Sequence, residues 1–247
     1  MKAMVLAAGL GTRLRPLTDR RPKALVELGG RTLLEITLTR LRGFGIREVI
    51  VNVHHFADMV VEYLEAHENF GMRVEISREK ALLDTGGGLK KAAWFFLEDG
   101  PSNDQPFVLH NVDVLSNIDL SRMVELHRQQ SALATLAVQD RKTSRYLLFD
   151  SEQRLCGRRA GPDGEPEMIR AVDSFQAFAF SGIHVISPRL LSMLNEDGAF
   201  SIVTSYLRLV GQGEAVGAFR ADQYYWRDLG KPENIAQAEA DLKNKVI

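Results

Sequence analysis

The chain opens with an apolar run that leads directly into a glycine-rich loop, Lys2-Ala3-Met4-Val5-Leu6-Ala7-Ala8-Gly9-Leu10-Gly11-Thr12-Arg13-Leu14. The apolar run is shorter than the hydrophobic part of a typical secretory signal, and cationic residues follow it almost at once. We therefore predict a buried first strand at residues 2–7. The glycines after it let the backbone approach a ligand closely, and successive N–H groups in such a loop form a concavity for phosphate oxygens.

Beyond this opening, short apolar runs alternate with amphipathic segments, which is typical of β-α-β units and a mostly parallel sheet. The predicted strands are residues 2–7, 48–53, 73–77, 106–110 and 132–138. The predicted helices are residues 32–44, 56–66, 88–97 and 119–129, with Thr32 and Asp119 as N-caps. Loops that follow the carboxyl ends of parallel strands share one edge, where open α/β sheets bind ligands.

The rhythm changes near residue 140, because β-like runs at 146–149 and 175–186 are separated by a turn-rich segment at 157–167. We predict a small β-rich insertion at about 140–180 that packs over the sheet edge. Helices at 188–194 and 202–210, strands at 215–219 and 224–228, and a last helix opened by Pro232 complete the chain. The prediction is one α/β domain over residues 1–247, with a Rossmann-like, mostly parallel sheet flanked by helices.

Composition excludes several classes of protein. The 31 Lys and Arg against 32 Asp and Glu give a net charge of −1, and 45% of the 247 residues are hydrophobic. These values exclude disorder and argue against a nucleic-acid partner bound by bulk electrostatics. No stretch approaches the roughly 18 apolar residues that cross a bilayer, so no membrane partner is expected. The single Cys156 allows no intramolecular disulfide and favours a cytoplasmic protein. The number of subunits stays open.

The loop after the first strand matches neither common phosphate motif. A Rossmann fingerprint needs glycine where Leu14 stands, and a P-loop needs Gly-Lys-Ser/Thr, which the chain lacks. The loop is long, because Pro16 and Pro22 delay the next helix. It carries a series of cations, namely Arg13, Arg15, Arg20, Arg21 and Lys23. That density of positive charge suits a triphosphate.

The run of residues 6–14, followed by Pro16-Leu17-Thr18 and Pro22-Lys23, resembles the opening motif of the sugar-1-phosphate nucleotidyltransferases. The resemblance implies an enzyme that joins an NTP to a sugar 1-phosphate and releases pyrophosphate. It implies that Arg13 clamps the triphosphate and that Lys23 reaches the α-phosphate and the sugar phosphate. The loop residues that it assigns to nucleotide binding are Ala8, Gly9, Gly11, Thr12 and Arg13.

Two aspartates each close a predicted strand: Asp113 follows residues 106–110, and Asp228 lies in Trp226-Arg227-Asp228-Leu229-Gly230. Carboxylates at a sheet edge are suitable ligands for a hard cation held between protein and phosphates. By their resemblance to the family's metal-binding carboxylates, Asp113 and Asp228 are expected to hold Mg²⁺, with Asp113 also catalytic. Val112 stands where the family has a glycine.

Two further segments resemble ligand-binding parts of the family. Leu83-Asp84-Thr85-Gly86-Gly87-Gly88 is similar to the nucleoside loop, which assigns Thr85, Gly86 and Gly87 to the nucleotide. Upstream, Glu79 stands where relatives carry a base-reading side chain; a carboxylate only accepts hydrogen bonds, which suits uracil, thymine or guanine. Phe180-Ser181-Gly182-Ile183 is similar to the sugar segment, so Gly182, Asn111 and Lys23 are the expected sugar-phosphate residues.

The expected substrates are UTP and a sugar like N-acetylmuramate 1-phosphate. Members acting on glucose 1-phosphate often have a Glu-Lys pair before the sugar segment, and none lies between Met168 and Phe180. Three alternatives stay open: a guanylyltransferase for mannose or heptose 1-phosphate, cytidylyl transfer to phosphocholine, and a non-catalytic nucleotide-binding regulator.

A few other polar residues are candidates for a functional role. Arg145 could meet a sugar carboxylate, although a surface arginine is the simpler interpretation. The adjacent His54 and His55 point to opposite sides of an extended segment and so do not suit one metal ion. For Cys156, no histidine partner is predicted, which argues against a nucleophile.

Overall fold

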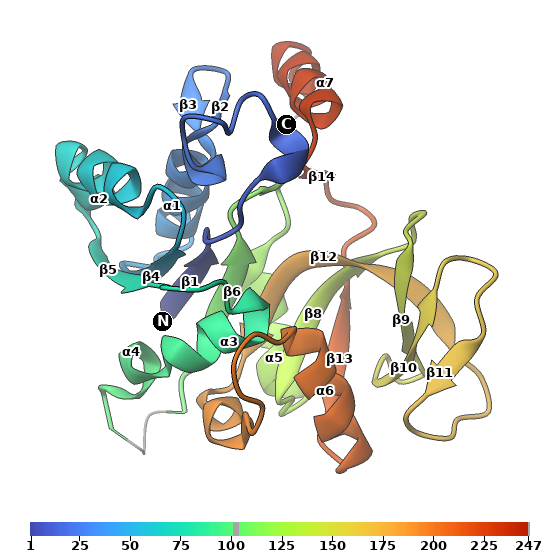
Figure 1. Ribbon diagram of the computed structural model, residues 1–247. Coiled ribbons are helices and arrows are strands. Elements are labelled where there is room, and N and C mark those ends of the chain that lie inside the picture. The colour runs from blue at the N-terminus through green and yellow to red at the C-terminus, as the bar shows by residue number, and fades with distance from the viewer. Residues whose placement is uncertain (101–103, 247) are drawn as a thin grey trace.

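The computed structural model describes residues 1–100 and 104–246, and a ten-stranded sheet forms its centre (Figure 1). The strands of this sheet are β1 (Lys2–Leu6), β4 (Glu48–Val53), β5 (Arg73–Arg78), β6 (Phe107–Asn111), β8 (Ala134–Gln139), β9 (Arg145–Phe149), β10 (Leu155–Ala160), β11 (Pro166–Met168), β12 (Gln176–Ile186) and β13 (Val216–Arg220). Their order is β11-β10-β9-β12-β6-β1-β4-β5, and β8 pairs with β12 and β13. Two short ladders accompany it: β2 (Glu27–Leu28) with β3 (Arg31–Thr32), and β7 (Val114–Ser116) with β14 (Trp226–Asp228).

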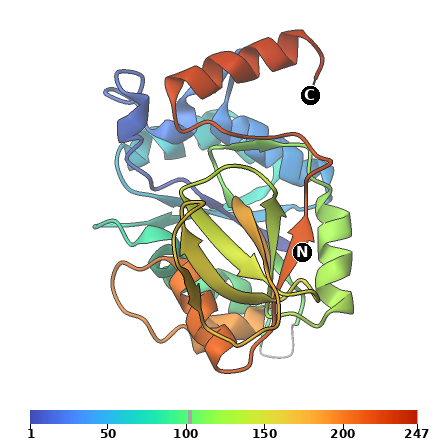
Figure 2. The same cartoon turned by 90° about the vertical axis from the view of Figure 1, so that its right-hand side faces the viewer.

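Helices cover both faces of the sheet. They are α1 (Leu33–Gly43), α2 (Ala57–Ala66), α3 (Asp84–Lys91), α4 (Ala93–Leu97), α5 (Leu120–Gln129), α6 (Ile202–Gly211) and α7 (Pro232–Lys243), with 3₁₀ turns at Thr12–Leu14, Lys23–Leu25, Glu68–Gly71 and Pro188–Met193. Side chains alternate through each strand, so Ala3 and Val5 join the core under α1, α2, α5 and α7, whereas Met4 joins the core under α3, α4 and α6. Figure 2 shows α7 and α6 at opposite ends of the molecule. The predicted Rossmann-like α/β fold is confirmed.

The predicted helix starts are made by side-chain caps. The Thr32 hydroxyl accepts from the Glu35 N–H at 3.1 Å, and the Asp119 carboxylate accepts from the N–H groups of Ser121 and Arg122 at 2.9 and 3.1 Å. Each cap satisfies donors that the first helical turn leaves without partners. Pro232 opens α7 as expected, since it needs no partner for a missing N–H. The predicted helix at 188–194 is a 3₁₀ turn instead.

The glycine segment before the predicted helix 88–97 is itself helical, which corrects the prediction. Helix α3 already begins at Asp84. Thr85 lies within its first turn, and the Thr85 hydroxyl accepts from the Ile202 N–H at 3.0 Å. A Cβ on Gly86 would lie 2.3 Å from Phe200, and one on Gly87 would lie 2.4 Å from the Gly198 carbonyl oxygen. These glycines permit close packing of α3 on the segment before α6.

The insertion also differs from the prediction, because it extends the sheet instead of packing over its edge. The segment 157–167 forms most of the hairpin of β10 and β11, and β9 pairs antiparallel with the first part of β12, Gln176 to Ala179. Strand β12 spans 11 residues, but only Ile183 to Ile186 pair with β6. Its first half is therefore free to receive β9, and Figure 1 shows the insertion strands continuing from β12.

A change of register bends β12 between Phe180 and His184, and Gly182 within it has a φ of +74°. Such irregularities re-aim a strand and are common beside functional sites. Within residues 1–100 and 104–246, no helix has the length and apolar character needed to cross a membrane.

Buried histidines make stability depend on pH. Burial lowers the pKa of His110 and of His184 to about 3, and that of His127 to about 4. In the unfolded chain these groups take up protons near pH 6.5. Their contribution is therefore complete above about pH 6.5 and is lost as the pH falls toward 4, by up to about 1.4 kcal/mol per pH unit for each histidine.

We expect the free energy of unfolding, measured with urea between pH 7 and 5, to fall with acidification. The dependence of this free energy on pH should be weaker in His127→Gln by up to about 1.4 kcal/mol per pH unit, because one buried histidine is removed. The exposed His67→Gln is the control and should keep the parental slope. An unchanged slope in His127→Gln would contradict the burial argument.

Candidate active site

The loops after β1 and β6 leave the sheet at the same edge. These strands are parallel neighbours, with Leu6 paired to Asn111, and the Val112 N–H extends the ladder by donating to the Leu6 carbonyl at 3.1 Å. The glycine loop and the segment that carries Asp113 therefore begin side by side. This is the edge that the alternation of strands and helices predicted.

The glycine loop folds back on itself at Gly11. This residue has a φ of +64°, and a Cβ on it would lie 2.9 Å from Thr18 Cγ2 and 3.1 Å from Lys23 Cβ. The Thr18 hydroxyl donates to the Gly11 carbonyl at 2.8 Å and closes the loop. A side chain at Gly11 would force apart the segments that bring Lys23 next to the backbone of the glycine loop.

The two aspartates come from segments that adjoin at the ladder of β7 and β14: Asp113 lies in the turn directly before β7, and Asp228 ends β14. Asp228 of β14 is paired with Val114 of β7, and the Leu229 N–H donates to the Asp113 carbonyl at 2.7 Å. Residues far apart in the sequence thus supply two carboxylates to one corner of the sheet edge. In the part of the chain that the structure describes, no group of three or more His, Cys, Asp and Glu side chains is arranged to hold a metal. Any ion here would complete its shell with water or substrate oxygens.

Lys23 forms an ion pair with Asp113, and the two side chains are only 11% and 15% exposed. A charge buried to this degree needs a partner, because desolvation is costly. The pair therefore holds the loop cation and the strand-end carboxylate at one point. A phosphate oxygen arriving there would compete with Asp113 for the ammonium group.

Arg13 reaches the same corner from the other side of the loop. A Cβ on Gly230 would lie 2.5 Å from Asp228 Oδ1 and 2.7 Å from Arg13 Nη2. The Gly230 N–H also donates to Asp228 Oδ1 at 2.6 Å. Figure 1 shows the loop after β1 beside β14 and α7. Gly230 is thus the contact point between the guanidinium and the second carboxylate.

Asn111 and Gly182, the expected sugar-phosphate residues, also meet. A Cβ on Gly182 would lie 2.9 Å from Asn111 Nδ2 and 2.9 Å from Val114 Cγ2. The bend in β12 therefore brings the sugar segment directly onto the strand end that precedes Asp113.

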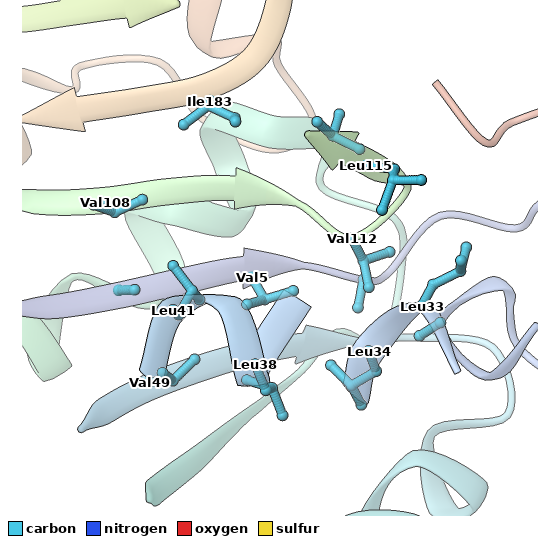
Figure 3. Close-up of a cluster of buried hydrophobic side chains, with 14 of the residues drawn as sticks. Val5, Leu33, Leu34, Leu38, Leu41, Val49, Val108, Val112, Leu115 and Ile183 are labelled. Atoms are coloured by element: carbon cyan, nitrogen blue, oxygen red, sulfur yellow. The ribbon is translucent and has the colours of Figure 1, made fainter. Parts of the chain in front are cut away.

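Val112, which replaces the family glycine, does not disturb this arrangement. Its side chain is 4% exposed and belongs to the core that includes Leu34 and Leu38. Figure 3 shows it on the core side of the strand end, among the side chains of α1. The next residue, Asp113, lies in the same turn before β7, and its side chain pairs with Lys23.

Polar groups of the segment expected to bind the nucleoside have partners within the protein. The N–H groups of Gly86 and Gly87 donate to the Phe200 carbonyl at 2.9 and 3.4 Å, so they are engaged inside the protein. Glu79 is 5% exposed, and its two carboxylate oxygens accept from Asn52 Nδ2 at 2.7 Å and from the Leu83 N–H at 3.1 Å. In the free protein these groups therefore have protein partners, and Glu79 holds the start of α3.

Arg141 lies beside the expected site residues, and the sequence analysis did not single it out. Its guanidinium stacks over the Trp226 ring at 3.7 Å, and Nη2 donates to the Phe180 carbonyl at 2.7 Å. Burial lowers its pKa, while Asp228 acts in the opposite direction. The sequence feature that could have identified Arg141 is its position just after β8. Strands β6 and β8 are both antiparallel to β12, so they run parallel to each other and their carboxyl ends point the same way. Arg145, considered in its place, is exposed.

Other polar residues take structural roles. His54 Nδ1 lies 2.9 Å from the Glu79 carbonyl oxygen, and the His55 ring packs on Phe56 at 3.9 Å. Burial raises the pKa of the Cys156 thiol to about 11, which disfavours the nucleophilic thiolate.

Comparison with known proteins finds matches over nearly the whole chain. The sequence profile described as nucleotidyl transferase matches residues 2–245. The N-acetylmuramate alpha-1-phosphate uridylyltransferase of Caulobacter vibrioides is 34% identical over 250 residues, covering 97% of this chain and 96% of the relative. The UTP–glucose-1-phosphate uridylyltransferase of Synechocystis sp. is 29% identical, with 100% of this chain matching 64% of the relative. The mannose-1-phosphate guanyltransferase of Yarrowia lipolytica is 27% identical over 95% of this chain and 62% of the relative.

Among solved structures, HddC from Yersinia pseudotuberculosis, crystallised with GMP-PN, has the same fold. The TM-score is 0.75 at 21% identity, covering 98% of this chain and 99% of HddC.

A cationic glycine loop facing two carboxylates across the carboxyl edge of a Rossmann-like sheet defines a class of enzymes that transfer phosphorus-containing groups. The profile match and the identity over nearly the whole of both chains narrow that class. The chain belongs to the nucleotidyl transferase family and is an enzyme of that family.

We expect Gly230→Ala to lower turnover by about 10²-fold with little change in melting temperature. The added methyl would displace Arg13 Nη2 and Asp228 Oδ1, and a displacement of about 1 Å in a site costs that much. Gly43→Ala is the control, because no atom lies within 4 Å of a Cβ there. Pyrophosphate release measures the effect, and equal activity of the two variants would refute the contact.

Proposed function

We propose that the enzyme joins an NTP to a sugar 1-phosphate, giving an NDP-sugar and pyrophosphate, with UTP and an N-acetylmuramate 1-phosphate-like sugar as the favoured pair. The observation that carries this proposal is the meeting of Arg13, Lys23, Asp113 and Asp228 at one corner of the sheet edge. The Caulobacter uridylyltransferase, similar over nearly its whole length, supports the choice of substrates.

In the proposed reaction, an oxygen of the sugar phosphate attacks the α-phosphorus of the NTP in line, and the bond to pyrophosphate breaks. A phosphate monoester is largely ionised near pH 7, so no general base is needed. The protein therefore contributes position and charge. Arg13 would stabilise the charge that develops on pyrophosphate. Lys23 would exchange its ion pair with Asp113 for contacts with the α-phosphate and the incoming sugar phosphate.

The backbone of the glycine loop completes the proposed triphosphate site, through Ala8, Gly9, Gly11 and Thr12. Asn111, Gly182 and Lys23 would meet the sugar phosphate. Arg141 lies beside them, because its Nη2 donates to the carbonyl of Phe180, two residues before Gly182. We propose that it faces the acceptor sugar.

Asp113 and Asp228 would hold Mg²⁺. Two carboxylates on adjoining segments, the turn before β7 and the end of β14, fit its preference for one or two acidic ligands together with phosphate oxygens. When bound, the ion would neutralise charge on the phosphates and make the α-phosphorus more electrophilic. The whole chain, including the insertion, would work as one domain, since β9 to β11 belong to the catalytic sheet. The cytoplasmic location inferred from cysteine usage stays a prediction.

We expect Arg13→Ala to slow pyrophosphate release by about 10²- to 10³-fold, the cost of removing one donor that stabilises developing charge. Arg15→Ala is the matched control two residues away, because the Arg15 side chain is 69% exposed. Both variants should keep the parental melting temperature. Normal turnover of Arg13→Ala would refute the assigned role.

A matrix of four NTPs against sugar 1-phosphates and phosphocholine, with magnesium and a pyrophosphate readout, tests the substrates. We expect the highest kcat/KM for UTP with N-acetylmuramate 1-phosphate. Preference for GTP with mannose or heptose 1-phosphate would select the guanylyltransferase alternative, and CTP with phosphocholine the cytidylyltransferase. No pyrophosphate from any pair would favour a non-catalytic regulator.

A further inference from the structure

Two polar side chains are buried behind the site without belonging to its proposed contacts. Asn52, near the carboxyl end of β4, is 3% exposed, and Glu79, directly after β5, is 5% exposed. Asn52 Nδ2 donates to Glu79 Oε1 at 2.7 Å. Polar groups buried this deeply cost free energy unless their partners are present, and here the bonds between and around the two side chains supply them.

The pair connects two segments that the proposed reaction uses. Asn52 Oδ1 accepts from the Ala7 N–H at 2.7 Å, at the start of the glycine loop. Glu79 Oε2 accepts from the Leu83 N–H at 3.1 Å, directly before α3. A chain of three hydrogen bonds thus runs from the phosphate loop to the nucleoside segment.

This chain has no spare room. A Cβ on Gly88 would lie 2.9 Å from Asn52 Nδ2 and 2.9 Å from Glu79 Oε1, so α3 packs directly on the pair. The absence of a side chain at Gly88 lets α3 approach the pair. Together with the lengths of the Asn52 and Glu79 side chains, this approach sets the spacing of β1, β4 and α3.

The donors and acceptors also explain why residue 79 is an acid. Both neighbours of its carboxylate donate, through an amide NH₂ and a backbone N–H. A glutamine would place its own NH₂ against one of these donors. A carboxylate is the side-chain end group that satisfies both at once, whereas an exposed base-reading residue would face no such requirement.

We infer that Asn52 and Glu79 are a positioning pair that sets the distance between the phosphate loop and the nucleoside segment, and thereby the affinity for the NTP. Neither residue contacts the nucleotide in this role. The inference rests on the proposed function, because it assumes that the NTP spans both segments.

A polarity swap tests the inference. Asn52→Asp sets two carboxylates against each other, and Glu79→Gln sets two donors against each other. The double variant restores every bond, because the new carboxylate at position 52 would accept from the Ala7 N–H and from the new amide NH₂ at position 79, while the amide oxygen at position 79 would accept from the Leu83 N–H. For each single variant we expect KM and the calorimetric Kd for UTP to rise about 10- to 100-fold, because the mismatch displaces the glycine loop relative to α3 and a displacement of about 1 Å in a site costs up to about 10²-fold. The double variant should return to within about threefold of the parent.

Two further variants complete the experiment. Glu62→Gln, at an exposed position on α2, changes the net charge by the same amount as Glu79→Gln and should leave the KM for UTP unchanged. Gly88→Ala presses on the pair without changing its chemistry, and it should raise the KM for UTP while altering the KM for the sugar phosphate less than about threefold. It also carries the test if the single variants do not fold.

Several results would overturn the inference. If Glu79→Gln changes the preference between UTP and GTP and the double variant is not rescued, Glu79 reads the base directly. If the single variants and Gly88→Ala lower the melting temperature but leave the Kd for UTP unchanged, the pair is only structural. Failure of the proposed function is a separate result, since the parent would then release no pyrophosphate with any pair, whereas the Kd for UTP could still be measured across the cycle.

Discussion

The parallel pairing of β1 with β4 and β6 is the constraint on which the site depends. In a parallel ladder the carboxyl ends of neighbouring strands meet at one edge, so the loops that follow them are forced together. The glycine loop after β1, Asn52 near the end of β4 and the Asp113 segment after β6 all share this edge. Their proximity follows from strand direction and requires no attraction between the side chains themselves.

Close contacts at glycine then adjust this edge. Gly11 lets Lys23 approach the loop, Gly182 lets the sugar segment approach Asn111, and Gly230 lets Arg13 approach Asp228. At each of these positions, a methyl group would meet a side chain that the site needs. The glycines of α3 differ, because they serve packing of that helix on the segment before α6 and on the Asn52–Glu79 pair.

Charge is arranged by opposition across the site. The loop supplies Arg13 and Lys23, and the strand ends supply Asp113 and Asp228, so the near-neutral composition conceals a cationic side facing an anionic side. The buried Lys23–Asp113 pair keeps both charges stable in the free protein. A nucleotide that takes over one partner replaces an existing interaction, and this exchange favours ligands with several phosphate oxygens.

Local sequence determined the elements whose signals are local. The alternation of apolar runs defined β1, β4, β5, β6 and β8, side-chain caps defined the starts of α1 and α5, and the opening motif indicated the glycine loop with Arg13 and Lys23. The order of strands also indicated that Asp113 lies at the ligand-binding edge. In each case the decisive physical information lies within a few residues, as periodicity, capping or backbone freedom.

Only the tertiary structure decided which surfaces these residues meet. Glu79 and the glycines of α3 resemble nucleoside contacts in sequence, and the structure adds partners that the sequence does not show, namely Asn52, Leu83 and Phe200. The insertion is part of the sheet because the first half of β12 does not pair with β6 and pairs with β9 instead. Arg141 is held beside Asn111 and Gly182 by its stacking on Trp226. Hydrogen-bond partners and cross-strand neighbours are chosen by segments far away in the chain, and no local pattern records them.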